Sequence, residues 1–297
     1  MNIFDEIKES FREGNYLSKL IYINLGVYAL VMILRIFFFF FQWEAGPLAL
    51  TKVLALPADP FVLLTRPWTL ITSMFFHQDF FHILFNLLWL FWFGKMFVQF
   101  LDEKKLLSIY LLGGLMGGLF YMLSYSLFPV FADVRANAYA FGASAAVSAI
   151  VIGMAVYSPN LKIHLMFLGP VSLKYIGIVY VFLDLVQLPV SNSGGHIAHL
   201  GGAFWGYWYV AKLKKGTNIA AGFERFLSNL LTRFRWGRKL SVSYKSTTAN
   251  SDYDYNYKKR VEQAEIDAIL EKIQRSGYAS LSADEKEKLF SYGNKKK

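Results

Sequence analysis

Long apolar runs alternate with short polar segments along most of the chain. Six runs stand apart, covering residues 20–43, 69–95 (starting between 69 and 77), 106–128, 140–157, 173–188 and 196–213. Several of them reach the length of about 18 apolar residues that is typical of helices spanning a lipid bilayer. The pattern therefore predicts an all-α membrane protein, a polytopic bundle of six transmembrane helices.

The same pattern divides the chain into three parts. Residues 1–18 carry apolar side chains at three- and four-residue spacing, which predicts a cytoplasmic amphipathic segment lying against the membrane. Residues 19–215 hold the six spans and form the second part. Residues 216–297 are more polar and more charged, and we expect them to form a cytoplasmic region.

The cytoplasmic region itself contains several predicted elements. An apolar stripe over 223–234, flanked by arginines, predicts a basic helix at the membrane interface, and a polar linker follows at 241–257. A second apolar stripe at helical spacing covers 261–273. Ser282, with Glu285 three residues later, matches a capping box and predicts a last short helix. We interpret these elements as a small helical docking tail.

Composition agrees with a membrane protein. The chain is 55% hydrophobic, whereas soluble domains average about 45–50%. The net charge of +10 would first suggest nucleic acid, but most basic residues lie beyond Ala211 or in short loops between spans. Such a distribution favours an anionic lipid leaflet, and not nucleic acid, as the partner of the basic residues. The absence of cysteine excludes a disulfide framework and a thiolate site.

The distribution of basic residues also predicts an orientation. Six spans place both termini on one side, and only Lys52, Arg66 and Arg135 fall in the three loops of the opposite side. By the positive-inside bias, both termini are expected in the cytoplasm. The first residues lack the basic-then-apolar order of a signal peptide, so we expect the first span to be retained. An inner (plasma) membrane location follows as our prediction.

Polar side chains gather at one expected depth. Ser144 lies about four residues into the fourth span, and the even-numbered spans all run from the outer face toward the cytoplasm. The first half of the second span and the start of the sixth supply the other members, which are His77, His82, Asn86, His196 and His199. Ionisable groups at such depth are costly and usually face a protein interior or a water cavity.

This set of residue types suits acyl transfer. A serine hydroxyl becomes nucleophilic when a positioned imidazole takes its proton, and His199 would reach Ser144 if the fourth and sixth spans approach closely. Small residues favour such an approach: Ala145, Ala149 and Gly153 on the fourth span, and Gly202 and Gly206 on the sixth. The side chains of His82 and Asn86, with the Ser144 amide, would stabilise the oxyanion. No acid lies at this depth on spans two, four or six, so a Ser-His dyad is predicted.

These motifs resemble those of rhomboid intramembrane serine proteases. The segments are HQDFFHILFN at 77–86, GASA at 142–145 and AHLGG at 198–202 with Gly206, and the similarity covers about residues 60–213. The resemblance implies a six-helix rhomboid-like bundle that hydrolyses peptide bonds in or near transmembrane segments of membrane proteins. It implies Ser144 as nucleophile, His199 as base, and no cofactor. It also implies His82, Asn86 and the Ser144 amide as oxyanion donors, with His77 and Gly142 in support.

Some positions depart from the family pattern. Thr69 stands where the family often has arginine, Val98 where it often has glutamate, and Ser148 where an aromatic residue often stacks on the base. His196 lies one turn before His199 and remains an alternative base, although the glycines at 202 and 206 follow His199 at the family's spacing.

Two other classes of function compete with proteolysis. A metal transporter could use the imidazoles of His77, His82, His196 and His199 to bind zinc, although no carboxylate or thiolate is expected to complete that site. A catalytically inactive rhomboid-like module could bind membrane proteins without cutting them. Asp184 in the fifth span is an intramembrane acid, for which we expect a hydrogen-bonded structural role.

Overall fold

The computed structural model describes residues 14–165, 169–234, 267, 269–274 and 277–294. It separates into two compact units, Met1–Arg235 and Trp236–Lys297. The amphipathic segment expected in residues 1–18 lies outside the described residues up to residue 13. The linker at 241–257 and the start of the stripe at 261–273 also lie outside the described residues.

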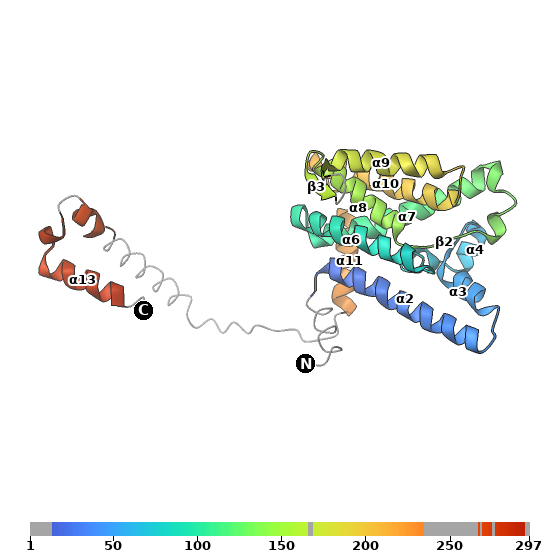
Figure 1. Cartoon of the computed structure of the whole chain (residues 1–297), viewed down its shortest axis with the longest axis horizontal. Helices are drawn as coiled ribbons and strands as arrows, with labels where there is room; N and C mark the ends of the chain where they lie inside the picture. Colours follow the sequence, from blue (N-terminus) through green and yellow to red (C-terminus); the bar gives the residue numbers. More distant parts are fainter. Residues whose placement is uncertain (1–13, 166–168, 235–266, 268, 275–276, 295–297) are drawn as a thin grey trace. The chain divides into compact units, whose positions relative to one another are not determined.

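Six main helices form the first unit (Figure 1), one for each predicted span. They are α2 (Tyr16–Phe40), α6 (Phe80–Phe100), α7 (Glu103–Leu127), α8 (Ser144–Tyr157), α9 (Leu173–Gln187) and α10 (Ser193–Lys214). By length and composition α2, α6 and α7 can cross a membrane, and α8 is a shorter apolar helix. Many large apolar side chains on the outside of the unit are exposed, as expected for surfaces that contact lipid. The prediction of an all-α membrane protein is confirmed.

Helix α8 occupies the centre of this unit. Its residues from 145 to 155 are all buried, and α10 and α7 pack against it most extensively. A Cβ atom added at Gly202 would meet the carbonyl oxygen of Ala145, and one at Gly206 would meet that of Ala149. The predicted close approach of the fourth and sixth spans is therefore confirmed, because only glycine lets these two backbones come so near.

The chain before α8 is not helical, contrary to the expected start of the fourth span at 140. Strand β2 (Tyr139–Ala140) pairs antiparallel with β1 (Leu56–Pro57), which lies between α3 (Gly46–Leu54) and α4 (Pro60–Thr65). This pairing takes the backbone groups of 139–140 out of a helix, so α8 begins only at Ser144. The connection between α2 and α5 thus contains two short helices and a strand.

The second span also begins later than expected. After the short helix α5 (Thr69–Thr72), the chain remains non-helical until Asp79, whose side chain accepts the amide N–H of His82 and caps α6. An aspartate at this position satisfies a free amide at the helix start, and so it fixes where the helix begins. His77, expected within the span, therefore lies in the connection that precedes it.

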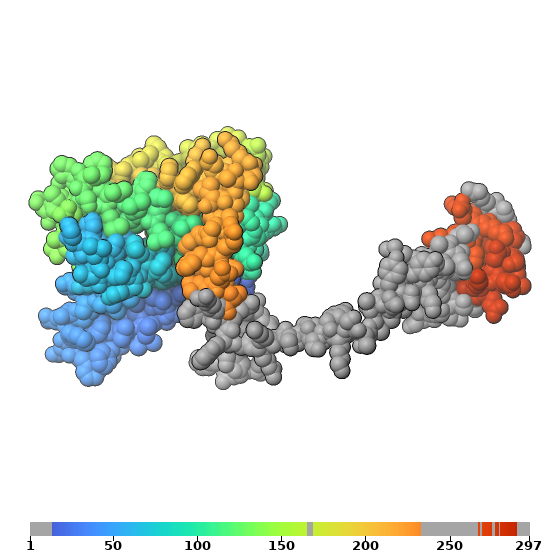
Figure 2. Space-filling view, turned by 180° about the vertical axis from the view of Figure 1, so that it is seen from behind, coloured from blue at the N-terminus to red at the C-terminus, as the bar shows by residue number. Residues whose placement is uncertain are grey.

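The remaining elements of the first unit lie at its periphery. Short 3₁₀ turns η1 (Pro129–Phe131) and η2 (Arg135–Asn137) follow α7, and a hairpin of β3 (Lys162–Leu165) and β4 (Gly169–Ser172) joins α8 to α9. Helix α11 (Ala221–Phe234) follows α10 along the outside of the unit, as Figure 2 shows in orange. The predicted basic helix at 223–234 is thus present as a helix.

The second unit is small and helical. It contains η3 (Tyr278–Ser280) and α13 (Ala283–Asn294), and Ile269 and Leu281 form its buried apolar cluster. The predicted capping box is confirmed, because Glu285 accepts the amide N–H of Ser282 at 2.7 Å and Ser282 accepts that of Glu285. A hydrogen bond from Lys272 lowers the pKa of the Glu285 carboxyl below its ordinary value.

Candidate active site

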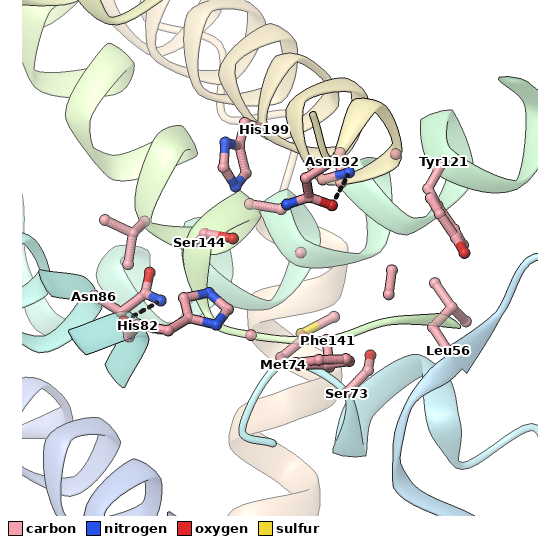
Figure 3. Close-up of a pocket in the computed structure, with 18 of the residues that line it drawn as sticks. Leu56, Ser73, Met74, His82, Asn86, Tyr121, Phe141, Ser144, Asn192 and His199 are labelled. Atoms are coloured by element: carbon pink, nitrogen blue, oxygen red, sulfur yellow. Dashed lines mark hydrogen bonds between the residues drawn. The ribbon is translucent and has the colours of Figure 1, made fainter. Parts of the chain in front are cut away.

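A cavity of about 720 Å³ opens among α6, α7, α8, α9 and α10 (Figure 3). Ser144, His199, His82 and Asn86 all line it. Figure 3 shows Ser144 between His199 on one side and His82 with Asn86 on the other. The structure therefore brings together the serine, the preferred base and both side-chain oxyanion donors that the sequence singled out.

Ser144 is presented by a bend in the chain immediately before α8. Gly142 has φ +113°, a left-handed conformation that residues with a side chain rarely adopt, and its amide donates to the carbonyl of Ser73 at 2.8 Å. A Cβ atom at Gly142 would lie 2.7 Å from Cε1 of His82. Glycine is thus required twice, for the turn and for the approach of the His82 ring.

His77 holds the backbone of this bend through a hydrogen bond. Its ring is fully buried, and Nε2 accepts the amide N–H of Ala143 at 3.2 Å. Nδ1 lies 3.2 Å from the carbonyl oxygen of Phe75, to which it must donate. The two contacts together assign a neutral ring with the proton on Nδ1. His77 therefore holds the residue next to Ser144, in agreement with its expected role in supporting the site.

Asn86 is held by two groups of the protein. Its Nδ2 donates to the carbonyl of His82 at 2.9 Å and lies 3.3 Å from Nε2 of His77. Both amide hydrogens are therefore directed at protein acceptors. To act as an oxyanion donor, Asn86 must exchange the longer of these contacts, the one to His77, for the substrate oxygen.

The first amide groups of α8 add a further electrostatic feature to the cavity. Ser144 is the first residue of a 14-residue helix, so its own N–H and the next ones have no carbonyl partner within the helix. The N-terminus of such a helix carries a partial positive charge, which favours an anion beside it. An oxyanion formed on a carbonyl attacked by Ser144 would lie close to this end.

The two histidines of α10 differ in what they face. Their ring centroids are 5.7 Å apart, and both rings are half-buried. His199 lines the cavity above Ser144 (Figure 3), whereas His196 is not among the lining residues. The geometry favours His199 over the alternative base His196.

Both histidines contact Asp184 of α9, a contact that the sequence interpretation missed. Asp184 Oδ1 lies 2.7 Å from Nδ1 of His196 and 2.9 Å from Nδ1 of His199. The prediction of a dyad considered acids on the second, fourth and sixth spans only, and Asp184 lies on the fifth. Helix α9 ends shortly before α10 begins, so Asp184 in its last turn lies beside the histidines in the first turns of α10.

Ser148 stands where the family often has an aromatic residue, and here an aromatic side chain comes from another helix. Ser148 Oγ lies 2.7 Å from the hydroxyl of Tyr180, which belongs to α9 and lines the cavity. The Tyr180 ring in turn meets Trp89 of α6 edge to face, with centroids 5.8 Å apart. An aromatic side chain thus reaches this wall of the cavity from α9 and not from α8.

The other two departures lie away from the cavity. Thr69 is buried, and its hydroxyl donates to the carbonyl of Arg66 at 2.7 Å, while the neighbouring Trp68 donates to the carbonyl of Val53 in α3. Val98, near the opposite end of α6, packs against the main apolar core. Neither substitution leaves an unpaired polar group beside Ser144.

One group of side chains in the described part of the chain has the composition of a metal site. The ligand atoms of Asp184, His196 and His199 lie within 4.8 Å of one another. The short distances from both Nδ1 atoms to one carboxylate oxygen correspond to N–H donors, however, and hydrogen bonds account for the cluster. His77 Nε2, a ligand atom in the zinc interpretation, already accepts the Ala143 amide.

Comparison with known proteins agrees with the geometry. A family model described as the rhomboid domain matches residues 64–216, just over half of the 297 residues. The chain belongs to the rhomboid family. A second model, of a family of unknown function (DUF6576), matches residues 250–295. The rhomboid match contains all of the cavity residues except Leu56, and the second match falls in the C-terminal unit.

Two curated rhomboid relatives each match about half of the chain. RHOMBOID-like protein 12, mitochondrial, of Arabidopsis thaliana is 32% identical over 160 residues, which is 51% of this chain and 48% of the relative. Presenilin-associated rhomboid-like protein A, mitochondrial, of Danio rerio is 27% identical over 150 residues, which is 49% of this chain and 37% of the relative. The chain thus spans half or less of the length of these relatives.

Proposed function

We propose that this rhomboid-family protein is an intramembrane serine endopeptidase. It would hydrolyse peptide bonds in or near the transmembrane segments of other membrane proteins. The observation that carries the proposal is the shared cavity of Ser144 and His199, which two closely packed helices, α8 and α10, place on facing walls. A serine alone in an apolar helix would more simply bond back to its own backbone.

The chemistry assigns one step to each group. Ser144 Oγ attacks the scissile carbonyl carbon while Nε2 of His199 takes its proton, and the imidazolium then protonates the leaving amine. The negative oxygen of the tetrahedral intermediate is stabilised by the amide of Ser144 at the start of α8, with His82 and Asn86 alongside. Water then attacks the acyl-enzyme with the help of the same histidine and releases the second product.

The substrate must unwind locally before this reaction. A helix in lipid has all its carbonyl groups hydrogen-bonded within itself, and it shields each peptide bond with side chains. Segments with small residues at the cut and helix-breaking residues nearby therefore suit this site. We propose that the site opens on the membrane side opposite the two termini, and that the termini are cytoplasmic in an inner (plasma) membrane with an anionic inner leaflet.

Two alternatives remain distinguishable by experiment. A catalytically inactive binding module would retain transmembrane partners without cutting them, and a histidine-based metal transporter would move ions instead. The presence of serine, base and oxyanion donors around one cavity favours the protease over the binding module. The occupation of His77 and Asp184 by protein hydrogen bonds disfavours the transporter.

The test is cleavage of a panel of single-span substrates by the full chain in lipid vesicles. Substrates with Gly-Ala cut sites and Gly-Pro pairs within the span should be cleaved by the wild type and by Ser126→Ala, a control on the exposed surface of α7. Ser144→Ala should cleave none of them. Cleavage that survives Ser144→Ala would overturn the proposal, and capture of the panel without any cleavage would favour the inactive binding module.

A further inference from the structure

We infer that Asp184 is a positioning residue for His199. It holds the imidazole with its proton on Nδ1, which leaves Nε2 unprotonated and directed toward Ser144. The inference rests on the proposed function for its consequence in catalysis, although the contact itself can be measured separately. It extends the predicted dyad to a chain of three groups from three helices: Ser144 of α8, His199 of α10 and Asp184 of α9.

The contacts of Asp184 carry this inference. Asp184 is buried, with 7% of the residue's surface exposed, and Oδ1 lies 2.9 Å from Nδ1 of His199. The second oxygen, Oδ2, is buried without a hydrogen-bond partner among the described residues. The two imidazole N–H groups are therefore what satisfies this carboxylate in the described part of the chain. A buried carboxylate held in this way specifies which nitrogen of each ring carries the proton.

The tautomer decides whether His199 can act as a base. A neutral imidazole has one N–H donor and one free lone pair, and only the nitrogen with the lone pair can take a proton from Ser144. With Nδ1–H donated to Asp184, the lone pair is on Nε2. When Ser144 attacks, its proton moves to Nε2, the imidazolium charge is balanced by the carboxylate, and Asp184 itself stays deprotonated.

His196 has a second part in this arrangement. Its Nδ1 donates to the same oxygen at 2.7 Å, from one turn earlier on α10. Two donors on one oxygen fix the carboxylate more tightly than one would, because a rotation of the Asp184 side chain would break both bonds. The histidine that the sequence left as an alternative base is thus better explained as a group that holds Asp184 in place.

The contact also links the base to α9. Most of α9 exposes apolar side chains on the outside of the unit, including Ile178, Phe182 and Val186. On its inner side it makes polar contacts at Asp184 and, one turn earlier, at Tyr180, whose hydroxyl meets Ser148. A displacement of α9 away from α10 would therefore withdraw the carboxylate from His199.

The test replaces the carboxylate and reads the tautomer directly. With the full chain in lipid nanodiscs and ¹⁵N-labelled histidine, NMR should show His199 with the proton on Nδ1 in the wild type and a mixture of tautomers in Asp184→Asn. His199→Gln assigns the signal among the five histidines. The Asp184→Asn variant should lose about 10²–10⁴-fold in kcat, the usual contribution of a general base, with KM little changed.

Three control variants separate positioning from a structural role. Asp184→Glu keeps the charge and should recover part of kcat and the Nδ1–H signal. Tyr180→Phe removes the contact of α9 with Ser148 and leaves Asp184 in place, so the His199 signal should stay as in the wild type. Asp133→Asn alters an exposed acid in the loop after α7 and should leave kcat unchanged.

Either of two results would overturn the inference. One is an unchanged His199 tautomer and kcat in a folded Asp184→Asn protein. The other is the same change of tautomer in Tyr180→Phe. This result would mean that the tautomer of His199 depends on the general packing of α9 and not on the Asp184 carboxylate. A wild type that cleaves no substrate would contradict the proposed function instead, and the NMR comparison would still decide the contact between Asp184 and His199.

Discussion

Nε2 of His77 accepts the amide N–H of Ala143 at a distance of 3.2 Å, across 66 residues of sequence. This bond joins the connection before α6 to the bend that presents Ser144. The same ring lies 3.3 Å from Nδ2 of Asn86, so a single buried imidazole contacts both the residue beside Ser144 and a predicted oxyanion donor. The shape of the site thus depends on a residue that takes no part in the reaction.

Replacing His77 should therefore lower the free energy of unfolding and the rate of substrate cleavage. His77→Ala leaves the buried Ala143 amide without an acceptor, which costs about 1–3 kcal/mol of unfolding free energy. His164→Ala is the control, because His164 is exposed on the hairpin β3–β4 and should change neither quantity. Denaturant unfolding and cleavage rate measure the two effects. Equal stability of the two variants would contradict the role of this bond.

A side chain at Gly142 should impair catalysis more than its effect on stability predicts. Gly142→Ala forces φ +113° on alanine, which costs about 1–3 kcal/mol, and it pushes the His82 ring away. Displacing an oxyanion donor costs about 10²–10³-fold in rate. Gly216→Ala has φ +81° but open space around it, so it should share the loss of stability and keep the cleavage rate. Similar rates for both variants would refute the contact with His82.

The close packing of α8 and α10 predicts a third effect. Gly202→Ala places a methyl group against the carbonyl oxygen of Ala145, so the two helices must separate. Overpacking of this kind costs about 1–3 kcal/mol and should move His199 away from Ser144, with a loss of cleavage rate. Gly222→Ala, in α11 with nothing near its Cβ, should be neutral or slightly stabilising. Thermal unfolding and rate measurements on both proteins test this, and an unimpaired Gly202→Ala would contradict the predicted packing.

Chelation separates the protease from the metal interpretation. A serine and an imidazole perform acyl transfer without a Lewis acid, so dialysis of the protein against EDTA should leave the rate of substrate cleavage unchanged. Loss of cleavage on chelation, restored by zinc, would instead show that Asp184, His196 and His199 hold a metal ion. The measurement is the initial rate before and after dialysis, with Ser144→Ala as the blank.

Much of the bundle could be predicted from local patterns in the sequence. Apolar length located the six helices, and the glycines at 202 and 206 predicted the contact of α10 with α8 because they need only a backbone close by. The cluster around Ser144 followed from counting residues from the end of each span, with the direction of the spans predicted from the basic residues. Each of these inferences uses information contained in one segment.

The features that the sequence did not reveal depend on pairs of distant segments. The start of α8 at Ser144 is set by the pairing of β2 with β1, and nothing in residues 139–140 alone indicates that strand. Asp184 was visible as an intramembrane acid, but its partners depend on how α9 packs against α10. The contact could have been found by noting that the last turn of one span lies near the first turns of the next span. Asp184 and the two histidines occupy those positions.

The most direct test of the central claim, that His199 activates Ser144, is covalent labelling by a fluorophosphonate. Mass spectrometry of the wild-type chain should find one adduct, on Ser144, and labelling should disappear in His199→Ala while His196→Ala is slowed far less. Labelling of Ser144 at the wild-type rate in His199→Ala would contradict this account.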